Sequence, residues 1–174
     1  VIKKGNQALI LLPEISLVDT LVDRVHRRFG FEPSIWHSNT SPSKKKEIWK
    51  NVFNGNENLV IGARSSLFLP FKNLDLIVVD EEHDTTYKQQ EQIIYNARDM
   101  AIARCSFENA TVALVSATPS MESLFNAREQ KYYHLNLPKR IGTAGLPSIE
   151  TINMRNEKMD KDAWISPSLK STIS

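Results

Sequence analysis

Short runs of apolar residues recur along this chain, and longer segments of mixed polarity separate them. The run at residues 7–12 is almost wholly apolar and stops at Pro13, and the run at 74–79 is broken only by Asp75. Short, almost wholly apolar runs of this kind are typical of strands buried on both faces of a sheet. The predicted strands cover residues 7–12, 34–37, 59–61, 74–79 and 111–115.

The segments between these runs have the spacing of amphipathic helices. Apolar residues fall four apart from Leu17 to Phe29 and share one face of a helix. Ser16 is placed to cap that helix and Gly30 to end it. Trp49 lies in another such segment and is expected in the core. The predicted helices cover residues 17–29, 42–54, 96–107 and 121–129.

The alternation of strands and helices predicts an α/β fold, with a parallel sheet and helices on both of its faces. In such folds, ligands bind at the carboxyl ends of the strands. Beyond Leu137 the pattern becomes irregular, because two prolines and two glycines fall between residues 138 and 147. We therefore expect a compact lobe at residues 1–140, followed by a linker at 141–174.

Composition and charge add little to this interpretation. The chain has 174 residues, 41% of them hydrophobic, and a formal net charge of +2, which neither requires nor excludes a nucleic-acid partner. The single cysteine, Cys105, cannot form an internal disulfide or a Cys-built zinc site. The sequence has no apolar run of about 18 residues and no signal-peptide pattern. We expect a cytoplasmic protein without a membrane partner.

The clearest chemical feature is the strand at 74–79, which runs directly into Asp80, Glu81, Glu82 and His83. An acidic run is commonly a solvated turn, but these acids lie where an open α/β sheet places its site. Hydrolysis of a nucleotide needs one carboxylate to hold hydrated magnesium and another near the attacking water. Adjacent acids at one strand end can supply both.

A second feature is the apolar strand at 111–115, which ends in Ser116, Ala117 and Thr118. These residues also suit a plain strand end that leads into the next helix. Together with the acids, they resemble a helicase motor. Asp80 to His83 resembles motif II of superfamily 2 helicases, and Ser116 to Thr118 resembles motif III.

Longer segments resemble one family within that superfamily, the primosomal protein N′ (PriA) replication-restart helicases. The resemblance covers roughly residues 5–140 and implies the first RecA-like, P-loop NTPase lobe of the motor. It is most specific from Asp80 to Gln90. The matching segments are residues 12–17, 62–68, 80–91, 95, 97–99 and 116–120.

The resemblance implies a role for each motif residue. Asp80 would hold the magnesium of MgATP, and Glu81 would orient or deprotonate the attacking water. His83 would face Ser116 and Thr118 and relay the nucleotide state to the DNA-binding surface. The residues implied in this coupling are Glu82, His83, Ser116, Ala117 and Thr118.

The resemblance also implies two groups of DNA-binding residues. The first group would contact the backbone of the single strand. The second would form an aromatic-rich loop that senses DNA, in which bases stack on rings. The first group is Pro13, Glu14, Ser16, Arg64, Ser65 and Ser66, and the second is Tyr87, Lys88, Gln89, Gln90, Tyr95 and Arg98.

The activity implied is that of an ATP-dependent 3′-to-5′ DNA helicase that restarts stalled replication forks and assembles the primosome. Its cofactors would be ATP and magnesium. Its partners would be single-stranded and forked DNA and the proteins of replication restart and the primosome. Intact Asp80 and Glu81 argue against a non-catalytic DNA-binding module on a helicase fold. The match at Tyr87 to Gln90 argues against another superfamily 2 DNA translocase.

The phosphate-binding pattern G-x-x-x-x-G-K-[ST] is missing from the sequence, because none of its six glycines is followed by lysine. We therefore expect a lobe cut from a longer protein just after that Walker A loop. The second lobe and the family's zinc module would follow residue 174, and no zinc site is expected here. Alone, this chain is expected to be inactive as an ATPase.

Overall fold

The computed structural model describes residues 1–138, 148–155 and 163–173. The chain divides into a unit at Val1–Tyr133 and a second one at His134–Ser174. The first unit contains the sheet and the candidate site residues, and the described residues of the second include one short helix, α5 (Pro167–Ile173). The predicted boundary between residues 140 and 141 lies outside the described residues.

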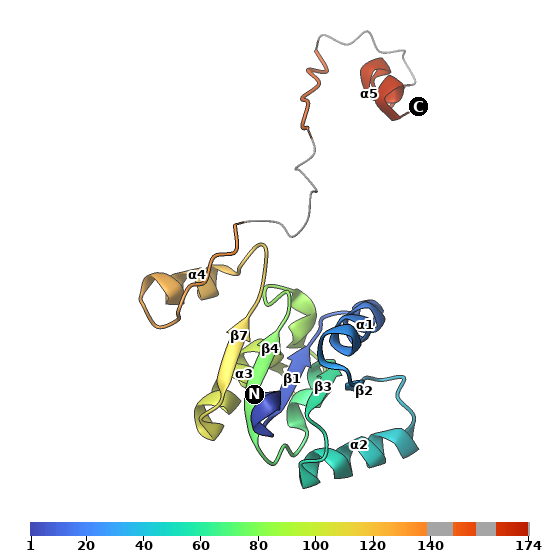
Figure 1. Cartoon of the computed structure of the whole chain (residues 1–174). Helices are drawn as coiled ribbons and strands as arrows, with labels where there is room; N and C mark the ends of the chain where they lie inside the picture. Colours follow the sequence, from blue (N-terminus) through green and yellow to red (C-terminus); the bar gives the residue numbers. More distant parts are fainter. Residues whose placement is uncertain (139–147, 156–162, 174) are drawn as a thin grey trace. The chain divides into compact units, whose positions relative to one another are not determined.

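A five-stranded parallel sheet with the order β2-β3-β1-β4-β7 forms the centre of the first unit (Figure 1). This confirms the predicted parallel sheet. The central strand is the first apolar run of the sequence. In the described part of the chain β7 pairs only with β4, so it is an edge strand. The strands are β1 (Gln7–Leu11), β2 (Ser34–Trp36), β3 (Leu59–Gly62), β4 (Leu74–Val79) and β7 (Thr111–Leu114).

Helices cover both faces of the sheet, as predicted, because side chains alternate along each strand. On one face, Ala8 and Ile61 pack with Val25 of α1. On the other face, Leu9 packs in one cluster with Val52 of α2 and with residues of α3. The helices of this unit are α1 (Val18–Phe29), α2 (Pro42–Asn54), α3 (Ala97–Glu108) and α4 (Met121–Arg128).

Three helices of the first unit begin at a side-chain cap. The Ser41 hydroxyl accepts from the Lys44 amide before α2, the Asn96 side chain from the Arg98 amide before α3, and Ser120 from the Ser123 amide before α4. These bonds satisfy amides that have no partner within the helix.

The predicted cap at Ser16 is wrong. A 3-10 turn at Ile15–Leu17 precedes α1, the N-cap is Leu17 and it makes no side-chain cap bond. The Ser16 hydroxyl instead donates to a Glu14 carboxylate oxygen at 3.1 Å.

The expectation that Trp49 lies in the core is also wrong, and the predicted stripe of α1 is buried only in part. Leu17 and Phe29, at the two ends of that stripe, are 44% and 54% exposed, whereas Val25 between them is buried. Trp49 is 46% exposed and stacks on Phe53 at the outer side of α2, with ring centroids 5.7 Å apart. Helical spacing identifies an apolar stripe, but only packing decides which edge of it is covered.

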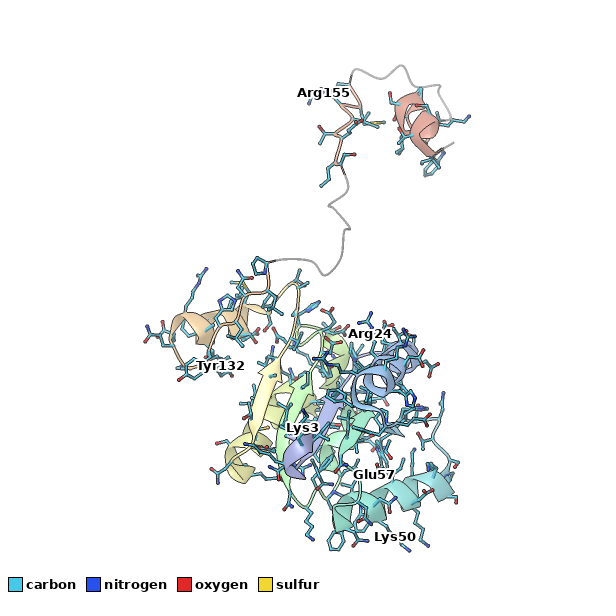
Figure 2. The ribbon with its side chains drawn as sticks, viewed as in Figure 1. Lys3, Arg24, Lys50, Glu57, Tyr132 and Arg155 are labelled. Atoms are coloured by element: carbon cyan, nitrogen blue, oxygen red, sulfur yellow. The ribbon has the colours of Figure 1, made fainter. Side chains whose placement is uncertain are left out.

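The outer surfaces of the helices carry charged side chains, such as Arg24 on α1 and Lys50 on α2 (Figure 2). Within the described residues, no helix has both the length and the apolar character needed to cross a membrane.

Candidate functional site

The acids predicted to carry the chemistry form a tight turn at the carboxyl end of β4. The Asp80 amide donates to the Leu11 carbonyl oxygen at 3.0 Å, and the Glu82 amide donates to the Val115 carbonyl oxygen at 3.0 Å. The turn is therefore tied to the ends of both neighbouring strands. Between these ties, Glu81 has φ +45°, a left-handed conformation that non-glycine residues rarely adopt.

Two of the acids are accessible. Asp80 is half-buried, and one of its carboxylate oxygens accepts from the Glu81 amide at 3.1 Å. The Glu81 side chain is 43% exposed. Carboxylate oxygens suit magnesium, which takes one or two of them together with phosphate oxygens and waters. The Asp80 carboxylate fits this requirement as a single protein ligand.

His83 connects the acid turn to the segment after β7, as predicted. Its Nδ1 lies 2.7 Å from the Ser116 hydroxyl, and its Nε2 lies 3.4 Å from the Thr118 hydroxyl. The same Nδ1 is 3.5 Å from a Glu81 carboxylate oxygen. Ala117, between the two hydroxyl residues, is exposed. The contacts are present, and their role in coupling stays a prediction.

Glu82 differs from its neighbours because its side chain is only 1% exposed. It accepts from the Ser120 amide at 2.7 Å, from the Ser120 hydroxyl at 3.0 Å and from Arg98 Nη1 at 3.2 Å. Burial alone raises the pKa of Glu82, but hydrogen bonds from Ser120, Ser123 and Arg98 outweigh it and hold the pKa below its usual value. Glu82 is a buried carboxylate that links the acid turn to the start of α4.

Arg98 is the partner of Glu82, and this contradicts its predicted place on the DNA-binding surface. Its side chain is 11% exposed, and Nη1 also donates to the Ser120 hydroxyl at 2.9 Å. Burial lowers its pKa, but bonds to Asp99 and Glu82 raise it above the usual value. The guanidinium is used within the fold because a buried carboxylate requires a partner.

Tyr87 is also wrongly predicted as a base-stacking residue, because it is only 1% exposed. Its hydroxyl donates to the Asp80 carbonyl oxygen at 2.6 Å, and the Leu11 carbonyl oxygen is within reach at 3.0 Å. Burial, followed by the nearby charges of Asp80, Asp84 and Glu81, raises the pKa of Tyr87. The ring fills the core beneath the acid turn.

The rest of the predicted loop is a small hairpin in which β5 (Lys88–Gln89) pairs with β6 (Tyr95–Asn96). Tyr95 is half-buried and meets the Phe68 ring edge-on, with centroids 5.4 Å apart. Lys88 and Gln90 are exposed. At the tip, Ile93 and Ile94 are 75% and 81% exposed, and nothing in their residue type distinguished them in the sequence.

Most of the predicted backbone-contacting residues do lie together at one edge of the sheet. Pro13, Glu14 and Ser16 follow β1, whereas Arg64 and Ser65 follow the adjacent strand β3. Glu14 and Ser65 are exposed. Arg64 is half-buried, and its Nη1 donates to the Lys88 carbonyl oxygen at 2.9 Å.

Ser66 is the exception in this group, because it is fully buried and its hydroxyl donates to the Ala63 carbonyl oxygen at 2.6 Å. The prediction of a DNA contact by its side chain is therefore wrong. Ser66 can pack this closely because Gly62 has no side chain. A Cβ on Gly62 would lie 2.6 Å from the Trp36 carbonyl oxygen and 2.7 Å from the Ser66 side chain. Trp36 Nε1 in turn donates to the Ser65 hydroxyl at 3.1 Å.

The sequence did not identify Ser120 and the Leu11 carbonyl group as parts of this site. Ser120 was recognisable as the residue before a helix, but its bond to Glu82 joins residues 38 positions apart. The Leu11 carbonyl group belongs to the backbone, so no residue type in the sequence indicates its role. Both contacts arise from the order of the strands in the sheet.

Comparison with known proteins gives one family and several relatives. Residues 1–126 match the family model described as DEAD/DEAH box helicase. The replication restart protein PriA of Rickettsia felis is 49% identical over 170 residues, which are 98% of this chain and 26% of that protein. PriA of Bacillus subtilis is 40% identical over 157 residues, which are 90% of this chain and 20% of that protein.

Among solved structures, RecG bound to a three-way DNA junction is similar with 26% sequence identity and a TM-score of 0.47. The similarity covers 71% of this chain and 16% of that chain. This chain spans about a quarter of the length of the first curated relatives that it matches.

Proposed function

The chain belongs to the DEAD/DEAH box helicase family, and from this membership we propose that it is the first RecA-like motor lobe of an ATP-dependent DNA helicase. The helicase restarts stalled replication forks, translocates 3′ to 5′ and works with primosome proteins on forked and single-stranded DNA in the cytoplasm. Sequence similarity to PriA proteins supports this choice within the family.

The acid turn after β4 is the observation that carries the proposal. It presents two accessible carboxylates, Asp80 and Glu81, at the carboxyl edge of a parallel sheet. In our proposal Asp80 holds the magnesium ion of MgATP, which neutralises charge on the phosphates when bound. Glu81 orients the attacking water and accepts its proton. His83 reports the state of this turn to Ser116 and Thr118.

The ends of the adjacent strands β1 and β3, at the same carboxyl edge of the sheet, form the proposed DNA contact. Residues after β1 and β3 lie on adjacent strands, so Ser16, Arg64 and Ser65 can follow one strand of DNA along its phosphates. Further candidate DNA contacts lie on the hairpin, at Lys88, Gln89, Gln90 and Tyr95. Arg64 joins the two groups through its bond to the Lys88 carbonyl oxygen.

The 174-residue chain supplies only part of this nucleotide site. None of its glycines is followed by lysine, so it has no loop of the G-x-x-x-x-G-K-[ST] type to cradle phosphates. We therefore propose that this chain alone hydrolyses ATP no faster than buffer, with or without single-stranded DNA. Release of phosphate by the purified chain above the buffer rate contradicts this part of the proposal.

The central test is Glu81→Gln in the intact protein that contains this lobe. The amide keeps the shape of the side chain and loses the base, so turnover should fall by a factor on the order of 100 or more. Binding of MgATP should stay within a few-fold. The companion variant Asp80→Asn should instead raise the magnesium concentration required for half-maximal hydrolysis.

Retention of more than half the normal turnover by Glu81→Gln would show that another group activates the water. A protein that binds DNA but has no ATPase activity even with intact acids would instead be a non-catalytic module on a helicase fold. Measurement of DNA binding and hydrolysis on the same preparation separates these two outcomes.

A further inference from the structure

Two buried side chains contact the two residues on either side of Glu81. On one side, the Tyr87 hydroxyl donates to the carbonyl oxygen of Asp80 at 2.6 Å. On the other side, Arg98 Nη1 donates to the carboxylate of Glu82 at 3.2 Å. Glu81 itself has an accessible side chain and lies between these two buried anchors.

The backbone of Glu81 needs such support, because its φ of +45° is unfavourable for a residue with a side chain. A left-handed residue of this kind persists only where its surroundings fix it. The hydrogen bonds from the Asp80 and Glu82 amides to the Leu11 and Val115 carbonyl oxygens fix the ends of the turn. The buried side chains of Tyr87 and Arg98 fix the same two residues a second time.

The Arg98 anchor reaches beyond Glu82. The guanidinium also donates to the Ser120 hydroxyl at 2.9 Å, and Ser120 donates twice to the Glu82 carboxylate. Glu82 is thus held by three donors from two other segments, the starts of α3 and α4. Within the described residues, every buried polar side-chain atom in the structure has a hydrogen-bond partner, so this network is complete as it stands.

We propose that Tyr87 and Arg98 are positioning residues that hold Glu81 in its left-handed conformation and so set the direction of its carboxylate. The inference rests on the proposed function, since the role of Glu81 belongs to it. Neither residue touches the nucleotide in this scheme. Their effect therefore appears in the step that uses Glu81, and ATP binding stays unchanged.

The test uses two conservative variants of the intact protein, Tyr87→Phe and Arg98→Lys. The first removes one hydroxyl, and the second keeps the charge but loses the forked guanidinium geometry. A small displacement of a catalytic group can cost up to a hundredfold, so kcat for ATP hydrolysis should fall by about five- to one-hundred-fold in each variant. KM for ATP should stay within about twofold.

Arg104→Lys is the matched control. Arg104 is on the same helix and is also largely buried, with side-chain exposure of 17%, but it bonds to the Leu67 and Leu69 carbonyl oxygens and to Glu108. It does not anchor the acid turn in the described structure. Arg104→Lys should therefore keep normal kcat, even if its melting temperature falls as much as that of Arg98→Lys.

The assays are run well below the melting temperature of each variant, which thermal unfolding gives separately. If Arg98→Lys does not fold, Tyr87→Phe alone decides, because it removes only the hydroxyl group and keeps the ring that fills the core. Normal kcat in a folded Tyr87→Phe variant, or a rise in KM with normal kcat, overturns the inference.

Glu81→Gln in the same assay separates the inference from the proposed function. Full turnover by Glu81→Gln means that the proposed function fails, and the positioning of Glu81 then has no catalytic meaning. Loss of turnover in Glu81→Gln with normal kcat in both positioning variants refutes the inference alone. Loss of turnover in Glu81→Gln and in both positioning variants, with normal kcat in Arg104→Lys, supports both the proposed function and the inference.

Discussion

Replacement of Arg98 by methionine should strongly destabilise this chain, because it removes one partner of a buried ion pair. The side chains of Arg98 and Glu82 are 11% and 1% exposed, and their charged atoms are 3.2 Å apart. Methionine keeps most of the length of the arginine stem, so the main loss is the charge and its hydrogen bonds. The Glu82 carboxylate then stays buried without a cation.

Breaking a buried pair in this way costs about 3–5 kcal/mol. The lower end of that range applies here, since the amide and hydroxyl of Ser120 still donate to Glu82. We expect the free energy of unfolding to fall by about 3 kcal/mol. Glu82→Gln added to Arg98→Met should restore part of this loss, and the double-mutant cycle should give a coupling of at least about 1 kcal/mol.

The assay is urea unfolding of the 174-residue chain near neutral pH, followed by circular dichroism. Arg27→Met is the control, because Arg27 and Asp23 form an exposed pair 3.9 Å apart with side chains 80% and 71% exposed. Its effect should stay within about 0.5 kcal/mol. An Arg98→Met loss as small as that of Arg27→Met would mean that water reaches the Glu82 site and that the network is not buried in solution.

Three further predictions follow from the same site. Gly62→Ala should destabilise the chain by roughly 1–3 kcal/mol in urea unfolding, because the added Cβ meets the Trp36 carbonyl oxygen at 2.6 Å; unchanged stability would contradict the packing described. Because hydrogen bonds hold the pKa of Glu82 below its usual value in the folded chain, its ionised form stabilises the fold at neutral pH, and this effect is lost in acid as the pH falls from the ordinary pKa of a glutamate, about 4.3, through the lower folded-state pKa. The difference in stability between the parent and Glu82→Gln should therefore stay constant between about pH 7 and pH 5 and become smaller only in more acidic buffer. In the intact protein, Arg64→Ala should weaken binding of single-stranded DNA and reduce the slope of log affinity against log salt by about 1; an unchanged slope would remove Arg64 from the DNA contact.

Much of the fold followed from the apolar pattern. The run that became β1 is buried on both faces, and such a strand leaves a signal in the sequence that needs no knowledge of its neighbours. The end of α1 at Gly30 was equally local, since a glycine cap depends on the left-handed conformation of that one residue. The exposed Trp49 and the missing cap at Ser16 depended instead on packing and turn geometry, which the pattern does not contain.

The candidate site also has a part that could be predicted from the sequence and a part that could not. Asp80, Glu81 and His83 could be located because they directly follow a strand, and parallel strands bring their carboxyl ends to one edge. Tyr87 and Arg98 were misplaced on a DNA-binding loop because a polar, aromatic segment is typical of a surface. Their burial comes from contacts with Leu11, 76 residues away, and with Glu82 and Ser120. Long-range contacts of this kind decide between a surface tyrosine and a core tyrosine.

The position of β7 at the edge of the sheet has a practical consequence for work with this chain. Thr111–Leu114 carries no charge and no proline, and the apolar side chains of Val115, directly after it, and of Met121 and Phe125 on α4 are 45%, 77% and 58% exposed. An uncharged edge strand with open backbone groups is a template for pairing with another copy of the chain. Purified material should therefore aggregate as its concentration rises, and a lysine placed at the exposed Thr111 is the substitution expected to keep it monodisperse.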